Sequence, residues 1–210
     1  MRYQNKAQLI QSLVTPEDVV LDVGFSGQGV RHCDAAWPHA LLKARAKEVY
    51  GLDVQLDSAF VDNPYYVQAS AEDFSLPVQF DVIFAGDLIE HLSNPGLFLA
   101  SCKRHLKPSG RLILTTPNTF NLFNIAEKLT KPEPTVNRDH TCYFNSNTMR
   151  TLLAKNDMAP VEMSYMYMLD TYFKESLKKR FLNGIYFLLS RMTDKFLETL
   201  VVVAVPHKNV

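Results

Sequence analysis

The chain has 210 residues, of which 47% are hydrophobic and 21% charged, and this balance is typical of one globular domain with a full core. Its 22 basic and 22 acidic residues cancel, which excludes a broad surface for nucleic acid. The polar start at residues 1–5 is unlike a signal peptide, and no apolar run reaches the roughly 18 residues of a membrane-spanning helix.

The segment 19–23, Val-Val-Leu-Asp-Val, is apolar and β-branched and predicts a buried strand. Asp22 interrupts it, and a buried carboxylate needs a partner. Gly24, Gly27 and Gly29 follow, and such glycines let the chain turn sharply or let a ligand approach closely, although an ordinary turn uses them too. Their spacing fits neither the dinucleotide fingerprint nor a phosphate-binding P-loop. The segment therefore favours a ligand without a pyrophosphate.

The next acidic residue at a strand end is Asp53. We expect an N-terminal helix within residues 3–13, an insertion at 31–39, a helix through 41–44 and a second strand over 49–53. An acidic side chain at the end of such a strand can accept both hydroxyls of a ribose. A solvated loop acid is the alternative.

Three further strands are expected at residues 65–69, 80–85 and 111–116. The second of them is apolar apart from Asp81, as expected of a central parallel strand. A helix begins at Ser-Asn-Pro in 93–95, and Lys-Pro-Ser-Gly in 107–110 ends it. This alternation of strands and helices predicts a doubly wound parallel sheet.

The regular alternation ends near residue 119. We expect one domain over 1–210, with helical insertions at about 119–145 and 171–193. The other elements expected in this part are a helix capped by Ser146 or Asn147, a strand over 158–170 and a last strand over 197–205.

Two motifs carry a resemblance to a known family. The segment from Asp22 to Gly29 resembles the first motif of the class I S-adenosylmethionine-dependent methyltransferases, in which a strand ends in Asp-x-Gly-x-Gly-x-Gly. Phe-Asp-Val-Ile at 80–83, followed by Glu-His-Leu at 90–92, is similar to a later segment of that family. The resemblance covers roughly residues 15–160 and the last strand. It implies a Rossmann-like, doubly wound sheet of seven strands, mostly parallel with the last strand antiparallel.

The resemblance also implies a cofactor, S-adenosylmethionine, bound at the strand ends. Its methionine part would lie over the glycine turn, and its ribose would bind Asp53. Asp73, or otherwise Glu72, would lie near the adenine amino group, although a capping turn explains this pair equally well. The cofactor-binding residues expected are Asp22, Gly24, Gly27, Gly29, Asp53, Glu72, Asp73 and Asp87.

Transfer of a methyl group to a hydroxyl requires a base. His140 and His91 are the candidates, because a neutral imidazole is available near pH 7. Asp139 could orient His140, whereas His91 could equally cap the following helix. Trp37 and His39 could line the acceptor pocket or belong to the core. No group of His and Cys has metal-ligand spacing, so no metal is expected.

The acceptor class follows from the same resemblance. Asp-His, Phe-Asn and Leu-Leu after residue 138 are similar to the small-molecule and glycan branch, and the Asn-Pro-Pro-Tyr motif of amino-directed nucleic-acid enzymes is absent from the sequence. We expect O-methylation of a small molecule or of a saccharide or lipid-linked acceptor. A nicotinamide-dependent oxidoreductase and a non-catalytic, methyltransferase-like partner subunit are the alternatives.

The cellular setting is indicated by the cysteines and by one basic segment. The cysteines Cys33, Cys102 and Cys142 form no Cys-x-x-Cys pair, which favours a reducing compartment such as the cytoplasm. Residues 172–193 combine apolar side chains at helical spacing with a group of four basic residues. Such a helix could lie on an anionic membrane surface, or it could cover the acceptor pocket or a dimer partner.

Overall fold

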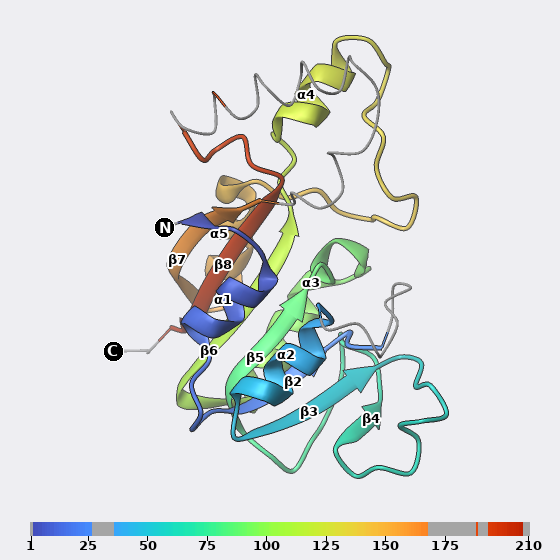
Figure 1. The fold of residues 1–210 in the computed structure, drawn as a ribbon, viewed down its shortest axis with the longest axis vertical. Coiled ribbons are helices and arrows are strands. Elements are labelled where there is room, and N and C mark those ends of the chain that lie inside the picture. The colour runs from blue at the N-terminus through green and yellow to red at the C-terminus, as the bar shows by residue number, and fades with distance from the viewer. Residues whose placement is uncertain (1, 27–35, 168–187, 189–192, 208–210) are drawn as a thin grey trace.

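The fold is built on one mixed sheet (Figure 1). A computed structural model describes residues 2–26, 36–167, 188 and 193–207. The described strands form an eight-stranded sheet in the order β1-β7-β8-β6-β5-β2-β3-β4. They are β1 (Arg2–Tyr3), β2 (Val19–Val23), β3 (Glu48–Asp53), β4 (Tyr66–Gln68), β5 (Phe80–Gly86), β6 (Leu106–Pro117), β7 (Met158–Met166) and β8 (Thr199–Pro206).

The strand directions confirm the predicted Rossmann-like sheet. Strands β6, β5, β2, β3 and β4 are parallel neighbours, and β8 lies antiparallel between β6 and β7. Because the chain winds from β2 toward β4 on one side and continues with β5 on the other, the sheet changes winding direction between β2 and β5. In open α/β sheets, ligands bind outside the carboxyl ends of strands at this kind of point.

The eighth strand is β1, which the sequence did not predict. Two residues cannot show an alternating pattern, and this strand exists because it pairs with β7. The Tyr3 hydroxyl also donates a hydrogen bond to Glu162 at 2.9 Å. These contacts place the N-terminal helix that follows against the sheet.

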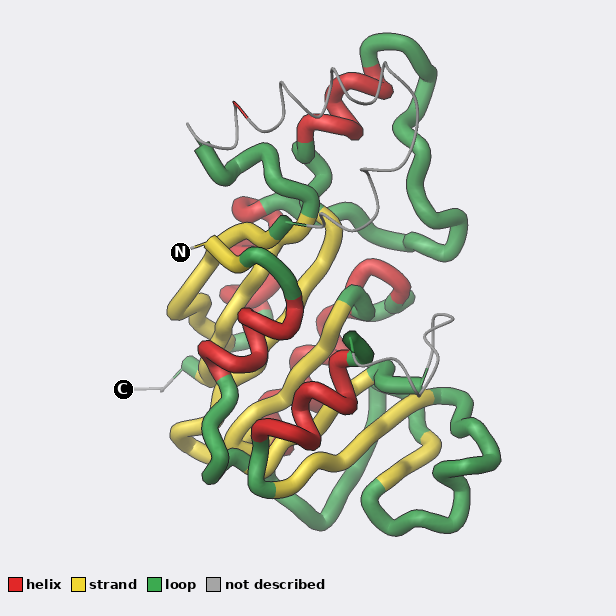
Figure 2. The backbone as a smooth tube through the Cα atoms, viewed as in Figure 1, coloured by secondary structure: helices red, strands yellow, loops and turns green. Residues whose placement is uncertain are grey.

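Helices cover both faces of the sheet (Figures 1 and 2). Helices α1 and α2 pack on one face, and α3 and α5 pack on the other. Such coverage is required because parallel strands are joined by crossover helices that bury both faces. The helices described are α1 (Lys6–Leu13), α2 (Pro38–Arg45), the 3₁₀ turn η1 (Ile89–His91), α3 (Pro95–His105), α4 (Leu122–Lys128) and α5 (Ser146–Lys155).

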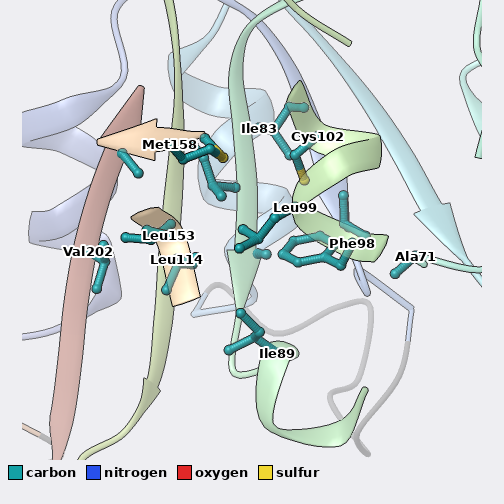
Figure 3. Close-up of a cluster of buried hydrophobic side chains, with 14 of the residues drawn as sticks. Ala71, Ile83, Ile89, Phe98, Leu99, Cys102, Leu114, Leu153, Met158 and Val202 are labelled. Carbon is teal, nitrogen blue, oxygen red and sulfur yellow. The ribbon is translucent and has the colours of Figure 1, made fainter. Parts of the chain in front are cut away.

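The larger core cluster lies under α3 and α5 (Figure 3). Burial of each large apolar side chain stabilises the fold by about 1.5–3 kcal/mol, so this cluster holds the carboxyl ends of the central strands in place. Its fully buried members include Ile83, Phe98, Leu99, Leu114, Leu153 and Val202.

The first predicted insertion, at 119–145, contains the short helix α4, which extends beyond the sheet in Figure 1. Helix α5 begins earlier than predicted, because its cap is Asn145 and not Ser146 or Asn147. The Asn145 side chain accepts hydrogen bonds from the backbone of Asn147 and Thr148. The second insertion, at 171–193, lies almost wholly outside the described residues. None of the helices in the described part of the chain is long and apolar enough to cross a membrane.

Candidate functional site

Acidic side chains gather where the carboxyl ends of β2, β3 and β5 meet. Asp22 lies near the end of β2, Asp53 ends β3, and Asp87 directly follows β5. Asp22 and Asp53 are only 3% and 8% exposed. Burial raises the pKa of Asp22, the hydrogen bond to His39 and the charge of Lys6 oppose this, and the charge of Asp53 adds to it. The structure therefore brings predicted residues from separate strands to one edge of the sheet.

The turn after β2 requires a glycine at position 24. Gly24 has a φ of +80°, and a Cβ atom there would lie 3.0 Å from Leu88. Its N–H donates to the Leu52 carbonyl at 2.8 Å. Two residues later, the Ser26 N–H donates to Asp53 at 2.9 Å. These bonds tie the glycine turn to the end of β3, whereas Gly27 and Gly29 lie outside the described residues.

Asp53 is positioned by its backbone neighbours. One of its oxygens accepts from the Ser26 N–H, and the other accepts from the Gln55 N–H at 3.2 Å. Because an ionised carboxylate has about four acceptor positions, it can still accept two hydroxyl groups. This geometry is compatible with the predicted ribose contact.

Asp87 occupies a strained position at the switch point of the sheet. Its φ is +52°, which is uncommon for a residue with a side chain. Its carboxylate accepts from the Thr115 hydroxyl at 2.8 Å and pairs with Lys6 at 2.7 Å. Lys6 comes from α1, far away in the sequence, and sequence reasoning did not identify it. The ion pair between Lys6 and Asp87 thus places a positive charge beside Asp22, Asp53 and Asp87.

Glu72 and Asp73 contact α3 and the residue that precedes it. Asp73 forms an exposed ion pair with Arg104 at 3.2 Å, and Glu72 accepts from the backbone N–H of Asn94 at 2.9 Å. The predicted role of these two residues beside the adenine stays a prediction.

Two imidazoles and a buried carboxylate form a second group beside these acids. The rings of His91 and His140 lie edge to face, with their centroids 4.7 Å apart. Glu90, His91 and His140 each offer a ligand atom, and these atoms lie within 4.8 Å of one another. The group joins the turn η1 to a loop about fifty residues later in the chain.

Backbone hydrogen bonds bring the two segments together. The N–H groups of Thr141 and Cys142 donate to the Glu90 carbonyl at 2.8 and 3.1 Å. The Thr141 hydroxyl donates to the Leu92 carbonyl at 2.6 Å. The loop that carries His140 is therefore fixed to the turn that carries His91.

Glu90 is a residue that sequence reasoning missed. It is 2% exposed, one oxygen accepts from the Thr116 hydroxyl at 3.0 Å, and no hydrogen bond to Oε1 is found among the described residues. Burial, followed by the charge of Asp87, raises the pKa of Glu90 to about 7. The sequence did offer a signal for a buried acid, because Glu90 lies between Ile89 and Leu92, two residues that pack toward the core.

The lowered pKa of His140 favours a base. Burial and then the neighbouring His91 lower the pKa of His140, while the charges of Asp87 and Asp139 oppose this. Within the described part of the chain, no hydrogen bond joins the exposed Asp139 side chain to His140, so Asp139 acts there through its charge. His91 does not cap the following helix, since α3 begins after Asn94 and has no side-chain cap.

The same three side chains could hold a metal ion. A carboxylate and two imidazoles are donor types that suit Zn²⁺, Mn²⁺ or Fe²⁺. The search for ligand spacing in the sequence led to the expectation of no metal. Ligand spacing in the sequence could not reveal these three side chains as a group, because only the fold brings His140 to Glu90 and His91.

Comparison with known proteins points to methyltransferases. The chain matches the family described as "Methyltransferase domain" over residues 21–114. It is 31% identical over 101 residues to the mitochondrial ubiquinone biosynthesis O-methyltransferase of Schizosaccharomyces pombe. That alignment covers 46% of this chain and 37% of the yeast enzyme. It is 29% identical over 175 residues to the ubiquinone biosynthesis O-methyltransferase of Aliivibrio fischeri. That alignment covers 73% of this chain and 70% of the bacterial enzyme.

The fold points to the same group of proteins. A SAM-dependent methyltransferase from Archaeoglobus fulgidus superposes with a TM-score of 0.61 at 20% identity, over 95% of this chain and 91% of that one. The two proteins therefore share a fold. Residues 21–114 thus match a methyltransferase domain, and the chain as a whole has the fold of a SAM-dependent methyltransferase.

Proposed function

We propose that this protein transfers the methyl group of S-adenosylmethionine to a hydroxyl group of a small-molecule acceptor. The observation that carries the proposal is the pair His91–His140 beside the acidic edge of the sheet, with ring centroids 4.7 Å apart. The relatives named above are O-methyltransferases, and an O-methyltransferase needs such a base.

The residues of the chain would divide the work between binding and proton transfer. When bound, S-adenosylmethionine supplies a methyl group that is already activated by its sulfonium. Asp53 and the turn at Gly24 hold the cofactor, so that the acceptor oxygen can align with the methyl carbon and the sulfur. A ring nitrogen of His140 takes the hydroxyl proton as the new carbon–oxygen bond forms and the carbon–sulfur bond breaks, and His91 is the alternative base.

An apolar cavity beside the loop that carries His140 supports a small acceptor with an apolar part. It has a volume of about 580 Å³ and lies between α4 and the loop that leads to His140, with Phe120, Ile125 and Val136 among its lining residues. Tyr143, three residues after His140, also lines it. An apolar lining favours an aromatic or alkyl group over a bare saccharide.

The test is methyl transfer to a panel of acceptors. Purified protein is incubated with methyl-labelled S-adenosylmethionine and with phenols, catechols, alkyl-substituted catechols or saccharides, and products are identified by mass spectrometry. We expect an O-methylated phenol or catechol. If the label is found only in a saccharide, the acceptor is a saccharide and not a phenol or catechol. If the protein binds NAD but not S-adenosylhomocysteine, it is an oxidoreductase. A partner subunit would bind the cofactor without turnover of any acceptor.

The cellular setting forms a separate proposal. We propose a reducing compartment such as the cytoplasm, because Cys102 and Cys142 are both free thiols. Contact of 172–193 with a membrane is supported by the sequence alone, since that segment lies almost wholly outside the described residues. Sedimentation with anionic liposomes at low and physiological salt tests it, and no binding at either salt would leave a lid or interface helix.

A further inference from the structure

A fully buried chain of polar side chains lies directly behind the acidic edge. His39, on α2, is 0% exposed. Its Nδ1 lies 3.0 Å from an oxygen of Asp22, and its Nε2 lies 3.2 Å from the hydroxyl of Tyr66. The imidazole thus bridges an acid near the end of β2 and a tyrosine on β4.

The hydrogen bonds select one tautomer for His39. The Lys43 ammonium donates to the Tyr66 hydroxyl at 3.5 Å, which leaves the hydroxyl hydrogen free to point at Nε2. Nε2 is then the acceptor, and Nδ1 carries the hydrogen that is donated to Asp22. Each polar atom of the imidazole has a partner, and the donated bond fixes the direction of the Asp22 carboxylate.

Aromatic packing holds the imidazole in this orientation. The ring of Phe25 lies 4.8 Å from that of His39, and the ring of Trp37 lies 5.0 Å from it, measured between centroids. The indole N–H of Trp37 donates to the Phe25 carbonyl at 2.9 Å. Phe25 directly follows Gly24, so the cluster supports both Asp22 and the glycine turn.

The charge at this edge fits a cationic ligand. Asp22, Asp53 and Asp87 meet there, and Lys6 is the cation that pairs with Asp87. The amino-acid part of S-adenosylmethionine carries an ammonium group on the carbon chain that leads to its sulfonium. A carboxylate bound on one side by an N–H group retains acceptor capacity for such a group on the other.

We propose that His39 is a positioning residue, which orients the Asp22 carboxylate toward the ammonium group of the cofactor. This inference rests on the proposed use of S-adenosylmethionine. The inference extends the proposed function, because it assigns a role to a buried histidine that acts through Asp22.

The test compares two ligands that differ only in the amino-acid part. S-Adenosylhomocysteine carries the ammonium group, and 5′-methylthioadenosine lacks it. The variants are His39→Asn, whose amide can replace the Nδ1 hydrogen, and His39→Gln, whose amide extends toward the position of Nε2. His105→Asn is the matched control, because His105 is also buried but bonds to Ser101 and Leu76 instead.

We expect His39→Gln to bind S-adenosylhomocysteine about 10- to 100-fold more weakly, as for a lost hydrogen bond to a charged group. Its affinity for 5′-methylthioadenosine should stay within about 2-fold of the wild type, and His39→Asn should recover most of the loss, on the same argument. An equal loss for both ligands, or none, would overturn the positioning role. If the wild type binds neither ligand, the proposed function fails instead.

Discussion

Glu90 shows how a single buried residue can report on the chemistry of the site. Its carboxylate accepts a hydrogen bond from the Thr116 hydroxyl through one oxygen, the other oxygen has no partner among the described residues, and two imidazoles lie beside it. Burial of an anion without enough partners costs free energy unless the anion takes a proton or a cation. This cost makes the stability of the protein depend on pH in a way that can be measured.

Replacement of Glu90 by Gln should remove that dependence. Below its ordinary pKa of 4.5, Glu90 is protonated in both folded and unfolded chains, so it contributes no difference. Between 4.5 and about 7 the folded chain keeps a proton that the unfolded chain releases, so the free energy of unfolding falls as pH rises. The loss reaches at most about 3 kcal/mol above pH 7, since each pKa unit corresponds to 1.36 kcal/mol.

Urea unfolding of the wild type and of Glu90→Gln, in EDTA at several values between pH 4.5 and 8, measures this difference. We expect the variant to gain stability relative to the wild type as the pH rises. A difference that is constant over the whole range would show that Glu90 keeps an ordinary pKa in the folded protein.

His140 is expected to take the proton of the acceptor. Replacement by Ala should lower kcat by about 10²–10⁴-fold, which is the usual contribution of a general base, while affinity for S-adenosylhomocysteine stays unchanged. Because its pKa lies below that of an ordinary histidine, the acid limb of the pH–rate profile should also lie below the ordinary value. His91→Ala is the comparison, and normal turnover by the His140 variant would assign His140 a structural role.

Among the elements, the turn η1 and the loop after residue 137 act as one unit. Three hydrogen bonds from Thr141 and Cys142 join them, so the distance between His91 and His140 depends on those bonds. A shift of about 1 Å at a reacting group can cost as much as 10²-fold in rate. The loop therefore sets the position of His140, the base that we propose.

Replacement of Thr141 by Val keeps the shape of the side chain and removes its hydroxyl. We expect a roughly 10-fold lower kcat and a loss of about 1 kcal/mol of stability, with no change in cofactor affinity. Thr151→Val is the control, because Thr151 donates to the Asn147 carbonyl within α5 and away from the site. If both variants lose the same stability and neither loses rate, the loop does not position His140.

The elements also show how far sequence patterns extend. The strands over 19–23 and 80–85 and the apolar last strand carry strong local signals, and the structure confirms them. Strand β1 depends on a partner more than 150 residues away, and no local pattern encodes such pairing. The predicted cap of α5, Ser146 or Asn147, was wrong, because several neighbouring polar residues can cap a helix and the hydrogen bonds select Asn145.

At the scale of the whole molecule, the sheet brings distant residues to one edge. Asp22 and Asp53 were identifiable because each lies at or near the carboxyl end of an apolar strand. Lys6, Glu90 and His39 were not identified as partners, since their contacts come from helices and turns packed against those strands. Parallel topology thus predicts where a site lies, whereas its second layer of residues follows only from tertiary packing.

The central claim is that this edge binds the cofactor with Asp53 on its ribose. Calorimetric titration of S-adenosylhomocysteine into the wild type, Asp53→Ala and the control Asp62→Ala, in which an exposed acid of the next loop is replaced, tests it directly. We expect saturable binding by the wild type and the control, and binding weaker by about 1–3 kcal/mol in Asp53→Ala. Unchanged affinity in Asp53→Ala, or no binding by the wild type, would contradict the account.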